Sequence, residues 1–173
     1  MLVLSVSSLK GGVGKTSVTL GLASAALSRG IPTLVVDMDP QADASTGLDV
    51  PVTTPADIAD VLAAPKSKLV KQAITPSGWV EGKHGVLDVI PGSPRAAEFD
   101  RPSLSDRYLK RLREAITRNG SKYRLVLIDC PPSLNGLTRA AWTASQRVLI
   151  VTEPGLFSVA AVSYTHLTLP TTP

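Results

Sequence analysis

The sequence predicts an α/β fold with a mostly parallel sheet and helices on both faces, because apolar strand-like runs alternate with helix-like segments. The composition agrees with this class. Hydrophobic residues make up 43% of the chain but aromatic residues only 4%, so Val, Leu, Ile and Ala must build the core. Such a core is typical of buried parallel strands covered by helices. At 173 residues the chain is long enough for one packed domain and too short for two.

Each expected strand is a short apolar run that stops at a polar, glycine or proline residue. We expect strands over residues 2–6, 33–36, 86–90, 125–128 and 148–152. Helices are expected over residues 15–29, 54–63, 66–73, 103–119 and 134–144. Gly30 and Gly120 are expected to end two of these helices. The alternation implies right-handed crossovers between the parallel strands.

Two of these helices carry specific sequence patterns. Thr54 begins a Ser/Thr-x-x-Asp cap, with Pro55 predicted at the first helical position. The helix over residues 103–119 is amphipathic, with its basic residues mainly on one side. The expected buried face consists of Leu104, Tyr108, Leu112, Ala115 and Ile116.

The net charge of +4 is concentrated in one segment. Residues 101–124 carry eight Lys or Arg against two acidic residues, a local excess of +6. This excess could attract nucleic acid or an acidic membrane surface; the alternative is the solvated face of a helix. No apolar run approaches the roughly 20 residues needed to span a bilayer, and no signal peptide is recognisable, so a cytoplasmic location is expected. The single cysteine, Cys130, excludes an internal disulfide.

A glycine-rich segment, Lys10-Gly11-Gly12-Val13-Gly14-Lys15-Thr16, lies between the first expected strand and its helix. Glycines let successive backbone N–H groups turn onto phosphate oxygens, and the helix N-terminus adds its dipole. Lys15 is expected to reach the β- and γ-phosphates, and the Thr16 hydroxyl to ligate Mg²⁺. The standard pattern has glycine where Leu9 stands. The sequence therefore predicts a P-loop that binds ATP with Mg²⁺.

Carboxylates follow two other expected strands. Asp129 ends the run over residues 125–128, in the position of a carboxylate that holds Mg²⁺ through a water. Asp37 and Asp39 close the second strand, where they suit metal positioning and water orientation. Cys130 lies beside this site and is expected to be a small buried residue rather than a nucleophile.

Three motifs resemble those of the ParA/Soj branch of the deviant Walker-type ATPases, which also includes MinD. They are Ser8-Leu9-Lys10-Gly11-Gly12-Val13-Gly14-Lys15-Thr16, Val36-Asp37-Met38-Asp39-Pro40-Gln41 and Ile128-Asp129-Cys130-Pro131-Pro132-Ser133. The resemblance implies that Lys10 crosses a dimer interface to the partner's ATP and that Asp39 orients the attacking water. It implies a phosphate cradle over Gly11, Gly12, Val13, Gly14, Lys15, Thr16 and Ser17, and a magnesium site of Thr16, Asp39 and Asp129.

Members of this family are ATP-dependent homodimers that bind DNA non-specifically and position plasmids or chromosomes. A centromere-binding ParB-like partner stimulates their hydrolysis, and they associate with the nucleoid when ATP is bound. By this resemblance residues 1–161 form the N-terminal part of the ATPase domain, and the sheet is incomplete at its C-terminal side. Residues 162–173 resemble the in-frame translation of a transposon-type sequencing adapter, so we expect a non-native or disordered tail. The alternative is an ordinary extended tail.

Three other functions stay open at this point. A MinD-like membrane-surface ATPase would need a C-terminal amphipathic helix. A metallocluster carrier would need cysteines that bridge subunits, and Cys130 is the only one here. The third alternative is a non-functional fragment, because a sheet cut after residue 152 would leave an exposed edge. The sequence Asp39-Pro40-Gln41 favours the partition ATPase by resemblance.

Overall fold

The computed structural model describes residues 1–81 and 84–153 of the chain. Within these residues six strands form one sheet, in the order β3-β4-β2-β5-β1-β6. Every neighbouring pair is parallel except β3 with β4, which confirms the mostly parallel sheet. The strands are β1 Leu2–Ser7, β2 Thr33–Asp37, β3 Thr75–Pro76, β4 Leu87–Ile90, β5 Leu125–Asp129 and β6 Arg147–Ile150.

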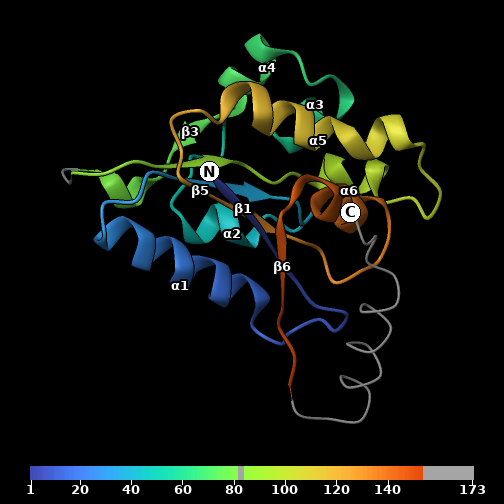
Figure 1. Ribbon diagram of the computed structural model, residues 1–173, viewed down its shortest axis with the longest axis horizontal. Helices are drawn as coiled ribbons and strands as arrows, with labels where there is room; N and C mark the ends of the chain where they lie inside the picture. Colours follow the sequence, from blue (N-terminus) through green and yellow to red (C-terminus); the bar gives the residue numbers. More distant parts are fainter. Residues whose placement is uncertain (82–83, 154–173) are drawn as a thin grey trace.

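Helices cover both faces of this sheet, as the sequence predicts. The α-helices are α1 Lys15–Ser28, α2 Asp43–Gly47, α3 Ile58–Ala63, α4 Ser67–Ala73, α5 Asp106–Asn119 and α6 Gly136–Ala144. Two short 3-10 helices, η1 Gly78–Val80 and η2 Pro94–Phe99, lie in the connections. Figure 1 shows α1 below the sheet and α3, α4 and α5 above it. None of the helices in the described part is long and apolar enough to cross a membrane.

The central strands supply side chains to two separate cores. On β2, Leu34 and Val36 belong to the core under α3, α4, α5 and α6, whereas Val35 belongs to the core under α1. On β5, Val126 and Leu127 divide between the two cores in the same way. Successive side chains of a strand point to opposite faces, so a sheet covered on both sides needs apolar residues at every position. This explains the uninterrupted apolar runs in the sequence.

The strand register brings the expected site together at one edge of the sheet. β5 lies between β1 and β2, and Asp129 at its end is paired with both Val6 and Asp37. Because these three strands are parallel, their carboxyl ends open on the same side. The segments that follow them therefore surround one place.

The start of α3 differs from the prediction. Asp57, not Thr54, caps the helix: its side chain accepts hydrogen bonds from the N–H groups of Ala59 and Asp60. The Asp60 carboxylate accepts the Asp57 N–H in return, which completes a capping box, so Pro55 lies before the helix. The capping box is thus present as expected but lies three residues later, on Asp57 and Asp60 instead of Thr54 and Asp57.

Other boundaries and faces also need correction. On α5 the buried face includes Leu109, whereas Tyr108 is half-buried, with the Arg111 guanidinium 3.7 Å from its ring centroid. β6 ends at Ile150 and α6 begins at Gly136, each two residues inside the predicted limit. α2 and β3 were not predicted. Residues 157–161 and the predicted tail at 162–173 lie outside the described residues.

Candidate functional site

The glycine-rich segment forms the loop between β1 and α1. Gly12 and Gly14 have φ angles of 78° and 86°, a region that glycine enters without the steric cost that a Cβ brings. A Cβ added to Gly11, Gly12 or Gly14 would meet no atom within 4 Å, so space lies open beside the loop. No side chain in the described part of the chain caps α1, and its first N–H groups can bind an anion there.

Lys15 is the central cation of the site. Its side chain is only 8% exposed, and its Nζ lies 3.6 Å from Asp39 Oδ2 and 3.6 Å from Asp129 Oδ1. The three residues come from the start of α1, from the segment after β2 and from the end of β5. The fold thus places a buried ammonium between two carboxylates at the N-terminus of a helix.

Asp129 is fully buried and is hydrogen-bonded to the first turns of α1. Thr16 Oγ1 donates to its Oδ2 at 2.8 Å, and Thr19 Oγ1 donates to its Oδ1 at 2.9 Å. Burial raises the pKa of Asp129, and the Lys15 charge and both hydroxyl hydrogen bonds oppose that rise. Thr19 was not among the residues predicted from the sequence. Its position four residues after Lys15, on the same face of α1, is the pattern that would have identified it.

The two carboxylates after β2 have different surroundings. Asp37 is fully buried, and its Oδ2 accepts hydrogen bonds from the N–H and the hydroxyl of Ser45, at 2.8 and 2.7 Å. Burial raises the pKa of Asp37 to about 7; the Ser45 hydrogen bonds oppose the rise and the Asp129 charge adds to it. Asp39 instead faces Lys15, while its Oδ1 accepts the Gln41 N–H at 3.0 Å. Asp39 is therefore the member of this pair that lies in the site.

Lys10 does not join this cluster. Its side chain is 64% exposed and forms an ion pair with Glu153, just beyond β6. The Ser8 hydroxyl donates to the Lys10 carbonyl at 2.9 Å, which helps to shape the entrance of the loop. Among the other residues expected in the phosphate cradle, Val13 is half-buried and Ser17 is exposed on α1. Lys10 thus lies outside the cluster around Lys15.

Cys130 is fully buried beside the site. Burial raises the pKa of its thiol to about 12, so the thiolate needed for nucleophilic chemistry is scarce at neutral pH. The interpretation as a small buried residue agrees with this environment. Across residues 1–81 and 84–153, no three His, Cys, Asp or Glu side chains gather into a group that could hold a metal ion.

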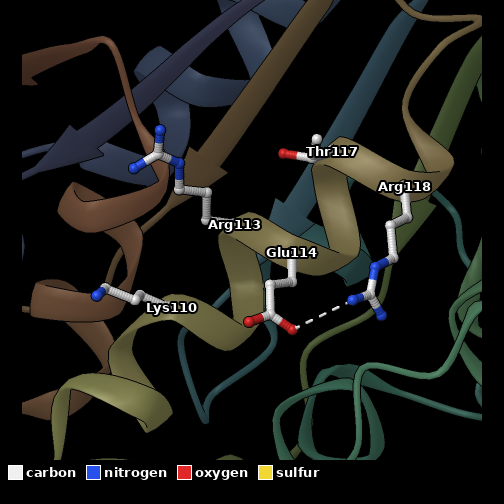
Figure 2. Close-up of a pocket in the computed structure, with 5 residues that line it drawn as sticks. All are labelled: Lys110, Arg113, Glu114, Thr117 and Arg118. Carbon is white, nitrogen blue, oxygen red and sulfur yellow. Dashed lines mark ion pairs between the residues drawn. The ribbon is translucent and has the colours of Figure 1, made fainter.

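A second charged surface lies on α5, away from the sheet. Figure 2 shows five side chains of this helix lining a hollow, with Glu114 paired to Arg118 at 3.9 Å. The other three are Lys110, Arg113 and Thr117. All five are exposed, so part of the basic excess of the sequence forms a solvent-facing surface, whereas Arg111 is half-buried and donates to the Leu62 and Ala63 carbonyls.

The chain is similar to a known protein family and to proteins of named function. A family model described as AAA domain matches residues 1–170. Two curated relatives are the chromosome partitioning protein ParA of Caulobacter vibrioides, 34% identical over 166 residues, and the sporulation initiation inhibitor protein Soj of Bacillus subtilis, 35% identical over 169. Each alignment covers 93% of this chain, which spans 59% of the ParA and 62% of the Soj length. These relatives agree with the resemblance seen in the three motifs.

Solved structures share the fold. One is cobyrinic acid a,c-diamide synthase from Mycobacterium smegmatis with a bound ATP analogue and magnesium. It is 25% identical with a TM-score of 0.76, and the match covers 98% of this chain and 70% of that one. A partition protein and a synthase therefore share these elements, and the function must be argued from the site.

Proposed function

This chain belongs to the AAA domain family, and from that premise we propose that it is part of a ParA-like ATPase, a dimeric switch that binds and hydrolyses ATP to partition plasmids or chromosomes. The observation that carries the proposal is the position of Lys15. A buried ammonium between Asp39 and Asp129, at the start of α1, suits the terminal phosphates of a nucleotide. The ParA and Soj relatives support the partition role.

The residues of the loop fit a nucleotide with magnesium. The space beside Gly11, Gly12 and Gly14 leaves room for phosphates against backbone N–H groups. Thr16 uses its hydroxyl hydrogen toward Asp129, so an oxygen lone pair stays available for a hard cation. Thr16, Asp129 and Asp39 would hold Mg²⁺. Asp39 and Asp129 both contact the Lys15 ammonium. The bound ion would neutralise charge on the phosphate oxygens.

Asp39 is the carboxylate proposed to orient the attacking water. Its side chain is nearly buried and reaches the same ammonium as Asp129, which keeps it beside the phosphate end of the loop. The Gln41 N–H holds Asp39 Oδ1, and Oδ2, which lies 3.6 Å from Lys15 Nζ, can accept a hydrogen bond from the water and so orient it. Hydrolysis by this arrangement needs positioning more than covalent chemistry.

Lys10 is proposed to contact ATP bound to the partner subunit of a homodimer. Its exposed side chain pairs with Glu153 and not with the carboxylates around Lys15, and such a surface ion pair is worth only about 0–1 kcal/mol. Exchanging that carboxylate for a phosphate across the interface therefore costs little. Lys10 would thereby couple ATP binding to dimerisation.

DNA is the proposed surface on which the dimer acts, together with a ParB-like partner that stimulates hydrolysis. The solvent-facing side chains of α5 include Arg107, Lys110, Arg113 and Arg118, which suit phosphate groups. The large exposed apolar side chains among the described residues are Met1, Leu2, Val52, Val86 and Leu149, none of them on α5. A membrane-binding helix would place such side chains beside the cations, so α5 favours DNA. We propose that the protein acts in the cytoplasm and associates with the nucleoid when ATP is bound.

The proposal is tested by Lys15→Ala in the full-length protein that contains this chain. Loss of a buried charged hydrogen-bonding partner costs about 2–5 kcal/mol in binding, so the Kd for a fluorescent ATP analogue should rise at least about 30-fold. Lys68→Ala, the same change at an exposed site on α4, is the control and should leave the Kd unaltered. An unchanged Kd in Lys15→Ala would show that this loop is not the nucleotide site.

A further inference from the structure

A buried serine on α2 connects the segments that surround Asp39. Ser45 is 7% exposed, and both its N–H and its hydroxyl donate to Asp37 Oδ2, at 2.8 and 2.7 Å. The Ser45 oxygen in turn accepts the N–H of Gly92 at 2.8 Å. One hydroxyl therefore joins α2, the end of β2 and the loop after β4.

The hydrogen bonds continue from Asp37 to Asp39. Asp37 Oδ1 accepts the Asp39 N–H at 3.2 Å, so the buried carboxylate that Ser45 holds also holds the backbone of residue 39. The Asp39 carbonyl accepts the Ala42 N–H at 3.0 Å, which closes the turn that leads into α2. The Asp39 side chain thus extends toward Lys15 from a backbone anchored on both sides.

Gly92 can pack against Asp37 and Asp39 because it has no side chain. A Cβ built there would lie 2.8 Å from Asp37 Cγ and 2.9 Å from the Asp39 carbonyl oxygen. Contacts this short leave no room for a methyl group, so the loop after β4 packs directly on residues 37 and 39. The loop therefore contacts both residues, and Ser45 holds the first of them, Asp37.

We propose that Ser45 is a positioning residue for hydrolysis: through Asp37, and with Gly92 packed behind, it holds Asp39 where it can orient the attacking water. This inference rests on the proposed function of Asp39. A displacement of about 1 Å in a catalytic group can cost about 100-fold in rate, whereas binding of the phosphates by Lys15 and the glycine loop does not need Asp39 in place. Loss of the Ser45 hydroxyl should therefore lower kcat, whereas the affinity for ATP depends on Lys15 and the glycine loop.

The first test compares Ser45→Ala with Thr46→Ala in the full-length protein. Ser45→Ala should lower kcat about 10- to 100-fold while the Kd for ATP changes less than about twofold. Thr46 is an exposed neighbour whose hydroxyl donates to the Ala42 carbonyl at 3.2 Å, so its variant loses a hydroxyl of the same helix without touching Asp37. Thr46→Ala should keep the wild-type kcat. If Ser45→Ala loses ATP binding or keeps its kcat, the positioning role is wrong.

The second test is a double-mutant cycle with Asp39→Ala. If Ser45 acts only through Asp39, adding Ser45→Ala to Asp39→Ala should change kcat by less than about twofold. A further tenfold loss would mean that Ser45 works by another route and would overturn the inference. If Asp39→Ala alone hydrolyses at the wild-type rate, the proposed function of Asp39 fails first, and the inference with it. If Asp39→Ala lowers kcat but Ser45→Ala keeps the wild-type kcat, the inference about Ser45 is refuted while the proposed function of Asp39 stands.

Discussion

Replacing Gly92 by alanine should destabilise this fold although the change adds a single methyl group. The new Cβ would lie 2.8 Å from Asp37 Cγ, 2.9 Å from Asp37 Oδ2 and 2.9 Å from the Asp39 carbonyl oxygen. The Asp37 side chain is held by three hydrogen-bond donors and the Asp39 carbonyl is backbone, so neither can yield cheaply. Overpacking of this kind costs about 1–3 kcal/mol of unfolding free energy.

The chain offers a matched control for this substitution. Gly21 lies within α1, where an added Cβ would meet no atom within 4 Å. Alanine is favoured over glycine in a helix interior by about 0.5–1 kcal/mol, so Gly21→Ala should stabilise the protein. The two identical replacements are therefore expected to change stability in opposite directions.

Urea unfolding of the full-length protein, followed by circular dichroism, measures both effects. The urea midpoint should fall for Gly92→Ala and rise for Gly21→Ala, with the slope of the transition unchanged. In thermal melts each kcal/mol corresponds to about 2–4 °C in Tm for a domain of 150–250 residues. A Gly92→Ala variant as stable as the wild type would show that the loop after β4 can move away, and the packing argument would fail.

Three further predictions concern the switch and its surface. Lys10→Ala should bind ATP but fail to dimerise, and a normal dimer in sedimentation with a slowly hydrolysed ATP analogue would contradict this. Asp39→Ala should bind ATP and dimerise but hydrolyse poorly; turnover within about twofold of wild type, worth only ~0.4 kcal/mol, would exclude the role. Arg113→Ala should weaken binding to DNA of any sequence and lower the salt dependence by about one ion, so an unchanged salt slope would remove α5 from the interface.

Much of the fold could be predicted because its determinants are local. The runs that became β2 and β5 are apolar over residues 34–36 and 125–128, without the alternation of a half-exposed strand, which is typical of strands buried on both faces. Local glycines likewise identify the loop before α1, because positive φ angles are costly for other residues. Of the residues that the structure gathers around Lys15, Thr16, Asp39 and Asp129 were predicted from their places at helix and strand ends, as was Lys15 itself.

The missed elements depend on partners distant in the sequence. α2 is a five-residue helix, too short to form by helix propensity, and its Ser45 is held by Asp37 from the end of β2. The cap of α3 involves Arg95, whose guanidinium bonds both Asp57 and Asp60 across a gap of 35 residues or more. β3 has two residues, one of them proline, and it joins the sheet by pairing with β4.

By itself the sequence determined the class of the fold, the glycine loop and the acidic residues at the strand ends, because each follows from the conformations open to a few neighbouring residues. The tertiary structure decided which of those residues meet. The strand order sets β5 between β1 and β2, so that Asp129 and Asp39 both reach Lys15, while Asp37 is withdrawn to Ser45 and Gly92. Such contacts join residues that are separated in the chain, and only the packed sheet brings them together.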